Sequence, residues 1–468
     1  MSPQPPPTVA GPIPTPEDVG ENRPDPRPKG HLGGIVSGSI AAGFVVALLL
    51  VAAPFIPPQE SRLTGAVLCG FAVGWAMLAV LSVRFTDQPQ RWAWAPALFM
   101  GLGGLLLVAF GSSVQGVLNW VWPPVMLALA IWMFVRVHRQ VRSRGARWLL
   151  NVVVGVLALA SIGGGYETVR EAMDARAYPA PGRLIDVGGH RLHLSCTGSG
   201  SPTVVLETGA GEMSSTFGWI APAVAQDTRV CVYDHAGRGW SEPADASLDG
   251  VQVATDLHTL LQRGQVSGPY VLAGHSFGGL YVLTFAARYP DEVAGMVLID
   301  STAPAPRVAA AASSGDRTSY DVTGRVSALV SSSARLGLGR LFGTLAGSGL
   351  PPQYRDEVSA KMATAGSIRS TIDEYVQPSA ARQAAALTDF ADKPLLVLTA
   401  GSGHDAAQTA AQNHLATPST NSVHRVIAGA THASLVAEPR DAAATTRAIL
   451  DVASSVRTGE PLIQRSGP

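Results

Sequence analysis

Five long apolar segments occupy the first third of the chain, and they limit its possible folds more than any other feature. Each contains about 19 to 22 residues, which as a helix is roughly 30 Å long and matches the hydrocarbon core of a bilayer. None has a charged residue in its interior, and tryptophans lie near several of the ends, as in an aromatic belt. We therefore predict five transmembrane helices, at 35–56, 63–83, 93–111, 117–135 and 148–166.

Basic residues are distributed unequally between the two sides of these segments. The side with the N-terminal tail and the loops after the second and fourth segments has ten lysines and arginines, and the other side has about four. The positive-inside rule predicts a cytoplasmic N-terminus, and because five is odd, everything after residue 166 is predicted to lie outside the cell membrane. The segments contain no carboxylate, lysine or histidine, which favours anchoring over ion transport. Gly70 and Gly74 predict a close helix contact on the second segment.

The remaining sequence divides by composition. Residues 1–33 are rich in proline and predict a disordered cytoplasmic tail. The net charge is zero and no basic stripe is present, which argues against a nucleic-acid partner, and three cysteines without a Cys/His cluster argue against zinc. We expect neither a metal nor a cofactor. The predicted parts are the tail, a transmembrane domain at 34–166, a linker at 167–181, a second domain at 182–455 and a C-terminal tail at 456–468.

The second domain alternates strand-like and helix-like segments. Short apolar runs lie at 203–207, 229–233, 270–275, 296–300, 395–399 and 424–428, and a hairpin is predicted around Gly188-Gly189. Such alternation predicts an α/β fold with a mostly parallel sheet that is covered on both faces and has its chemistry at the carboxyl ends of the strands. Residues 301–392 interrupt the alternation and are too long for a connection, so we predict a cap over the site.

A serine between glycines is the strongest catalytic signal in the chain. Ser276 lies in Gly274-His275-Ser276-Phe277-Gly278, directly after the apolar run at 270–273. Glycine on both sides permits the sharp strand-to-helix turn that presents a serine hydroxyl at the end of a strand. We therefore predict that Ser276 is a nucleophile for acyl transfer.

A serine nucleophile needs a base, a carboxylate that orients the base, and N–H donors for the oxyanion. His432 follows the last predicted strand and is the expected base, while His404 is expected to be a solvated loop residue. For the acid we favour Asp405, after the strand at 395–399, although this residue could instead cap a helix. Asp300, at the end of the strand at 296–300, is the rival.

Two backbone groups are predicted to bind the oxyanion. One is the N–H of Phe277, which directly follows the nucleophile, and the other is the N–H of Ala210 in the glycine-rich turn after residue 207.

These residues together resemble the α/β-hydrolase superfamily over about 182–455. The marks of the resemblance are the serine turn, the late histidine and the segment at 233–242, which is similar to the family's turn after strand four. The resemblance implies a mostly parallel eight-stranded sheet with a helical cap. It also implies that strands two and four are neighbours, which would bring Cys196 and Cys231 together as a disulfide or as two buried thiols. Thr208 departs from the histidine that is common before the oxyanion glycine.

The sequence thus predicts a membrane-anchored serine hydrolase that cleaves carboxylic esters, with a small or lipid-like ester as substrate and the bilayer as a partner. Two alternatives remain. A proline-releasing aminopeptidase would need a carboxylate in the cap for the substrate amine, and four are available: Asp356, Glu357, Asp373 and Glu374. A non-catalytic membrane sensor would use the same domain only to bind a ligand.

Overall fold

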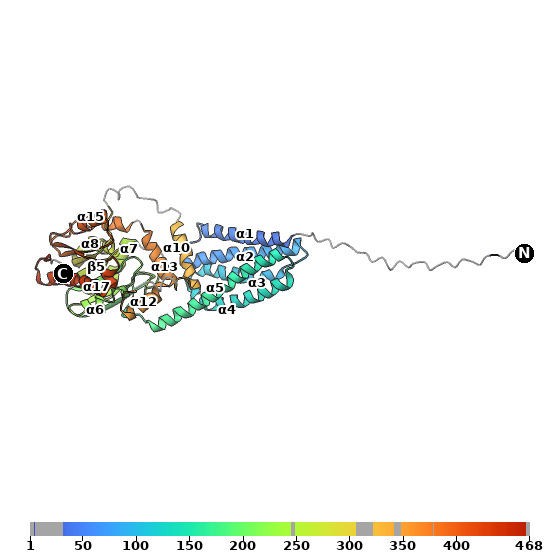
Figure 1. Ribbon diagram of the computed structural model, residues 1–468, viewed down its shortest axis with the longest axis horizontal. Helices are drawn as coiled ribbons and strands as arrows, with labels where there is room; N and C mark the ends of the chain where they lie inside the picture. Colours follow the sequence, from blue (N-terminus) through green and yellow to red (C-terminus); the bar gives the residue numbers. More distant parts are fainter. Residues whose placement is uncertain are drawn as a thin grey trace.

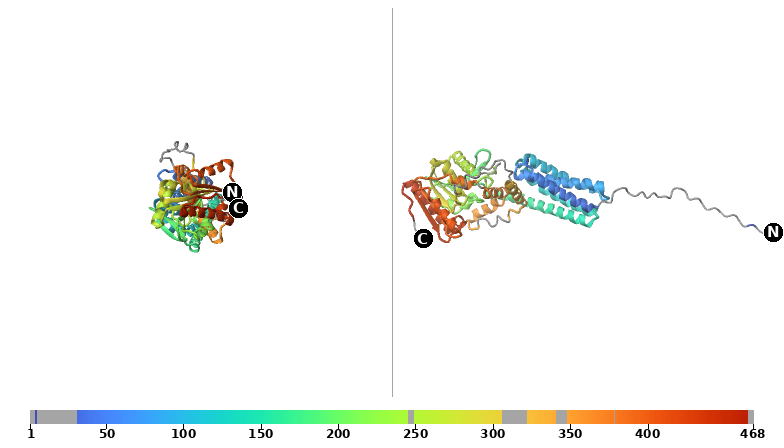
Figure 2. Two further views of the ribbon diagram at one scale, coloured as in Figure 1. Left: turned by 90° about the vertical axis from the view of Figure 1, so that its left-hand side faces the viewer. Right: turned by 90° about the horizontal axis from the view of Figure 1, so that it is seen from above.

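A helical bundle and a sheet domain lie end to end in the computed structural model, with shorter helices between them (Figures 1 and 2). The structure describes residue 4 and residues 31–244, 249–305, 322–340, 348–377 and 379–464. Most of the predicted tail at 1–33 lies outside these residues.

The bundle confirms that the first third of the chain forms five helices long and apolar enough to cross a membrane. Gly70 and Gly74 allow α1 and α2 to approach closely, because a Cβ on Gly70 would lie 2.4 Å from the Ala47 backbone. The helices are α1 (Leu32–Ala52), α2 (Glu60–Phe85), α3 (Trp94–Phe110), which follows the short helix η1 (Arg91–Ala93), α4 (Ser112–Gln140) and α5 (Arg144–Ala177).

The predicted linker at 167–181 is wrong over most of its length, because α5 continues to Ala177. The extension is stabilised by charge pairs with Arg340, whose guanidinium lies 3.0 Å from Glu167 Oε2 and 2.6 Å from Asp174 Oδ2. Glu167 and Asp174 are therefore buried partners on one face of a helix.

The sheet domain contains the predicted, mostly parallel sheet of eight strands. The strand order is β1-β2-β4-β3-β5-β6-β7-β8; β2 is antiparallel to both of its neighbours, β1 and β4, and the other pairs are parallel. The strands are β1 (Arg183–Asp186), β2 (Arg191–Thr197), β3 (Thr203–Glu207), β4 (Val230–Tyr233), β5 (Tyr270–His275), β6 (Val293–Ile299), β7 (Leu395–Ala400) and β8 (Ser422–Ile427).

Helices cover both faces of this sheet, as the fully buried central strands require. One face packs against α7 (Gly250–Arg263) and α8 (Gly278–Arg288), and the other packs against α6 (Ile220–Val224) and α17 (Pro439–Thr458). The last helix ends three residues into the predicted C-terminal tail.

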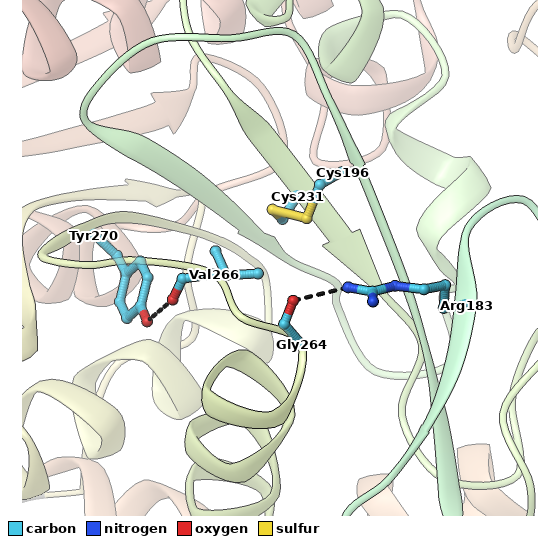
Figure 3. The surroundings of a disulfide bond; sticks show 6 residues. All are labelled: Arg183, Cys196, Cys231, Gly264, Val266 and Tyr270. Carbon is cyan, nitrogen blue, oxygen red and sulfur yellow. Dashed lines mark hydrogen bonds between the residues drawn. A yellow bond between two sulfur atoms is a disulfide. The ribbon is translucent and has the colours of Figure 1, made fainter.

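Cys196 and Cys231 form a disulfide between β2 and β4 (Figure 3). The two residues lie directly opposite each other in the antiparallel pair, with Cα atoms 4.0 Å apart. The structure therefore favours the disulfide over the two free thiols that the sequence left possible. Nearby, the side chain of Arg183 donates to the Gly264 carbonyl and fastens the hairpin to the end of α7.

The described helices of the predicted cap are α10 (Val322–Ser332), η4 (Ser333–Leu336), α12 (Pro352–Met362), α13 (Ala365–Tyr375) and α14 (Ala380–Ala384). Helices α10 and α13 lie between the bundle and the sheet (Figure 1), whereas α14 packs against α7 and α8. Arg325 donates to the carbonyls of Val51 and Ile56 at the end of α1, and Arg335 forms an ion pair with Glu60 at the start of α2. The cap is thus attached to the bundle as well as to the sheet.

Candidate active site

Ser276 occupies a strained turn between β5 and α8. Its backbone φ is +54°, a value that residues other than glycine rarely adopt. The flanking glycines make the turn possible, because a Cβ on Gly274 would lie 2.7 Å from Gly278 O and one on Gly278 would lie 2.4 Å from Thr208 O. The predicted elbow is therefore present, and the serine is half-buried at the carboxyl end of β5.

His432 bridges Ser276 and an aspartate. Its Nε2 lies 2.9 Å from Ser276 Oγ, and its Nδ1 lies 2.6 Å from Asp300 Oδ2. With Nδ1–H donating to the carboxylate, Nε2 is left to accept the serine proton. The imidazole is 51% exposed, so a substrate can reach it from solvent.

Asp300 is held as a carboxylate at the end of β6. Burial alone would raise its pKa, but hydrogen bonds from His432 and from the Ala400 N–H lower the pKa below its ordinary value. The Ala400 nitrogen lies 2.9 Å from Asp300 Oδ1, and His404 Nε2 lies 3.3 Å from the same oxygen. Sequence reasoning missed this contact, since it treated His404 as a solvated loop residue.

The preference for Asp405 as the partner of His432 is wrong. Asp405 is the N-cap of α15 (Ala406–Leu415), where its carboxylate accepts the Gln408 N–H at 2.7 Å in a capping box. It lies five residues beyond the end of β7 and is exposed. Asp300 comes directly after β6, the neighbour of β5, which ends directly before Ser276, and is therefore brought beside the histidine.

The turn predicted to supply an oxyanion donor packs directly against the serine. A Cβ on Gly209 would lie 3.0 Å from Ser276 Cβ. The N–H of Gly209 donates to Glu212 and that of Gly211 to Glu374, whereas the N–H groups of Ala210 and Phe277 have no partner among the described residues. The two predicted donors are therefore the ones left free to bind a developing oxyanion.

His275 and Glu212 support the site, and no sequence pattern indicates that they pair. Glu212 Oε2 lies 2.9 Å from His275 Nδ1, and the His275 ring stacks on that of His432 with centroids 4.7 Å apart. Burial alone would lower the pKa of His275, but the Glu212 carboxylate raises it. Glu212 therefore links the oxyanion turn, through Gly209, to the ring beneath the base.

A buried charge network connects this turn to the cap. Glu374 of α13 accepts the Gly211 N–H at 3.1 Å and pairs with both Arg238 and His235. His235 also contacts Glu207, and these carboxylates raise its pKa to about 9, against the effect of burial. Sequence reasoning named Glu374 only as one of several cap acids, because no local pattern reveals a contact across 163 residues.

The alpha/beta hydrolase fold model matches residues 202–439, half of the chain, and the chain belongs to this family. The family identifies a hydrolase. Within the described residues, no group of three or more histidine, cysteine or acidic side chains is placed to hold a metal ion.

Curated relatives share shorter regions with the chain. An uncharacterized protein of Schizosaccharomyces pombe is 33% identical over 213 residues, which are 39% of this chain and 37% of that protein. The 2-hydroxymuconate semialdehyde hydrolase of a Pseudomonas species is 33% identical over 129 residues, which are 26% of this chain and 44% of that enzyme. An uncharacterized vacuolar membrane protein of Saccharomyces cerevisiae is 29% identical over 132 residues, which are 24% of this chain and 20% of that protein. The chain thus spans less than half the length of each.

Solved structures resemble the sheet domain at low identity. An esterase from Thermogutta terrifontis is 23% identical, with a TM-score of 0.43 over 57% of this chain and 95% of that one. An enol-lactonase from Burkholderia xenovorans is 21% identical, with a TM-score of 0.42 over 58% and 100%. The fold assignment rests on the family match and on the strand order rather than on these likenesses.

Proposed function

We propose that the protein is a membrane-anchored serine hydrolase that cleaves carboxylic esters through an acyl-enzyme on Ser276. The observation that carries this proposal is the chain of hydrogen bonds from Ser276 through His432 to Asp300, with steps of 2.9 and 2.6 Å. This arrangement is what a hydroxyl needs to become a nucleophile at neutral pH.

The reaction follows from the geometry. Ser276 Oγ attacks the ester carbonyl while His432 Nε2 takes its proton, and the resulting oxyanion binds the N–H groups of Ala210 and Phe277. The imidazolium, stabilised by Asp300, then protonates the leaving alkoxide, which departs as an alcohol and leaves the acyl group on Ser276. A water molecule repeats the attack, and the products are a carboxylic acid and the free serine.

The N-terminal bundle is proposed to anchor this domain in the cell membrane, with residues 1–33 in the cytoplasm and the domain at 182–455 outside. The support is the excess of basic residues on the side of the N-terminus and the odd number of spanning helices. A disulfide in the sheet domain is consistent with an oxidising compartment.

The aminopeptidase alternative loses support because its candidate acids already have partners. Glu374 pairs with Arg238 and His235, and Asp373 lies 2.7 Å from Arg369. Glu357 accepts the Ser215 hydroxyl at 2.6 Å, and Asp356 contacts Arg355 at the surface. A substrate amine would have to displace one of these partners.

A fluorophosphonate probe tests the proposal, because it labels only an activated serine. We expect the full-length protein to be labelled and to hydrolyse a series of p-nitrophenyl esters, while Ser276→Ala does neither. Aminoacyl anilides in the same assay examine the peptidase alternative. Absence of labelling in folded protein, or equal ester turnover by Ser276→Ala, would favour the non-catalytic sensor.

A further inference from the structure

Two adjoining cavities connect the bundle to the cap. The lower cavity, about 390 Å³, lies among α2, α3, α4, α5, α10 and η4. The upper cavity, about 250 Å³, lies where the cap-side end of the bundle, the cap and the sheet domain meet. Gln115 and Arg335 line both, so the two cavities share a wall. The lower cavity occupies the cap-side half of the bundle, which the proposed topology places in the outer leaflet.

The lower cavity is amphipathic. Deep in the bundle its walls are apolar, whereas its cap-side end carries polar groups. Its volume is near the lower end of the range for small-molecule pockets, about 300 to 1,000 Å³, which suits one hydrocarbon chain better than two. The apolar walls are formed by residues that include Leu68, Met100, Leu107, Trp122, Met126 and Leu157.

Neutral polar groups without partners face this cavity. Gln115 is only 9% exposed, and in the described part of the chain its side-chain amide makes no hydrogen bond; the same holds for the amide of Asn119, one turn further along α4. The Thr64 hydroxyl is buried without a partner on the facing helix α2. Unsatisfied polar groups are costly in a bilayer, so two amides and a hydroxyl gathered on one cavity point to a polar ligand group.

The charges around the cavities disfavour an anionic ligand. Arg335 is paired with Glu60, Arg369 with Asp373, and His235 with Glu374, so each cation on the upper wall already has a carboxylate. Glu171 adds a further carboxylate to the lower wall. A phosphate would therefore meet no uncommitted cation among these residues, whereas hydroxyl and ester groups match the amides.

We propose that the lower cavity binds a single-chain amphiphile with an uncharged, ester- or hydroxyl-bearing head, taken laterally from the membrane. The chain lies along the apolar wall, and the head binds Gln115, Asn119 and Thr64 and faces the upper cavity. One wall of the upper cavity is Glu374, which also holds the Gly211 N–H of the oxyanion turn. The site is thus separate from Ser276 but adjoins elements that support it. The inference relies on the proposed membrane placement and goes beyond the proposed reaction.

Photocrosslinking on a Ser276→Ala background tests binding without hydrolysis, so failure of the proposed reaction does not affect the result. The full-length protein is placed in nanodiscs with 1-palmitoylglycerol that carries a diazirine at mid-chain, and adducts are mapped by mass spectrometry. We expect adducts on cavity residues of α4 and α5, and competition by unlabelled 1-palmitoylglycerol. The phosphate counterpart, palmitoyl lysophosphatidic acid, should compete at least tenfold more weakly.

Matched variants locate the site. Ala160→Trp fills the cavity and should abolish these adducts, whereas Leu159→Trp, on the neighbouring lipid-facing position that is 70% exposed, should leave them unchanged. Gln115→Leu keeps the side-chain volume but removes the amide, and it should weaken competition by unlabelled 1-palmitoylglycerol by at least fivefold. If Ala160→Trp misfolds, Gln115→Leu alone tests the site. Adducts confined to lipid-facing residues, or insensitive to both cavity variants, would overturn the site. Equal competition by the phosphate lipid would overturn the uncharged head.

Discussion

At the residue scale, the site depends on which carboxylate orients His432. An aspartate at this position fixes the tautomer whose Nε2 can accept the serine proton and stabilises the imidazolium that forms. Asp300 accepts from Nδ1 at 2.6 Å and is buried, whereas Asp405 caps a helix in an exposed position. The two acids therefore have different roles, which a pair of matched substitutions can distinguish.

We predict that Asp300→Asn lowers kcat for ester hydrolysis on the order of 10³- to 10⁴-fold, because the amide favours the wrong tautomer of His432. Asp405→Asn should stay within about twofold of wild type, since asparagine is also a good N-cap. The measurement is steady-state turnover of a soluble p-nitrophenyl ester, with thermal melting as the check on folding. A large loss in Asp405→Asn with Asp300→Asn active would restore the acid that the sequence favoured.

Local sequence patterns identify some residues of this site but not others. Ser276 and His432 could be located because a glycine-flanked turn and a loop after the last strand are local patterns. The preference for Asp405 over Asp300 is wrong, because both residues follow strands and only the sheet order reveals which of them lies beside Ser276. The pairing of Glu212 with His275 joins residues 63 positions apart, so no local pattern announces it.

At the scale of elements, α13 holds the oxyanion turn through Glu374. This carboxylate lies between Arg238, His235 and the Gly211 N–H. Burial alone would raise its pKa, but Arg238 and His235 lower the pKa to about 2. The sequence indicated the cap only through the break in the strand–helix alternation. The positions of its helices could not be predicted, because they depend on ion pairs with the bundle and with the sheet domain. The cap thereby contributes to the order of the active site, because Glu374 accepts the Gly211 N–H of the oxyanion turn.

The charge network predicts a pH dependence of stability. The pKa of His235 is raised from 6.5 to about 9. Its contribution to the free energy of unfolding is therefore complete below pH 6.5 and is lost as the pH rises toward 9. The pKa of Glu374 is lowered from 4.5 to about 2, so its contribution is complete above pH 4.5 and is lost as the pH falls toward 2. The network is therefore fully stabilising between about pH 4.5 and 6.5, and the histidine contributes roughly 3 kcal/mol there.

We predict that Glu374→Gln reduces the fall in melting temperature between pH 6 and pH 9, because without this carboxylate the pKa of His235 lies nearer its unfolded value. Asp373→Asn is the control, since this neighbouring acid pairs with Arg369 and is not part of the network. Melting is followed by intrinsic fluorescence of the full chain in one detergent. An identical pH slope in wild type and Glu374→Gln would show that the network does not couple to folding.

At the scale of the whole molecule, ion pairs join the cap to the end of the bundle. Arg335 pairs with Glu60 of α2, and Arg340 pairs with Glu167 and Asp174 of α5. The five apolar segments were evident in the sequence, but the extension of α5 was not, because it depends on ion pairs with Arg340, which lies at least 166 residues further along the chain. Packed helices rather than a flexible linker therefore set the distance from the bundle to the turn that contains Ser276.

This arrangement makes the compartment of the sheet domain testable by counting thiols. The chain has three cysteines, and if residues 182–455 lie outside the cytoplasm, Cys196 and Cys231 are oxidised and only Cys69 of α2 is free. We predict that maleimide-polyethylene glycol, added to protein denatured without reductant after rapid acid quenching of cells, attaches one label, and three after reduction. Cys69→Ala should change these numbers to none and two.

A C-terminal alkaline phosphatase fusion should be active and a fluorescent-protein fusion dark. Three labels without reductant, together with an inactive phosphatase fusion, would place the domain in the cytoplasm and reverse the proposed topology.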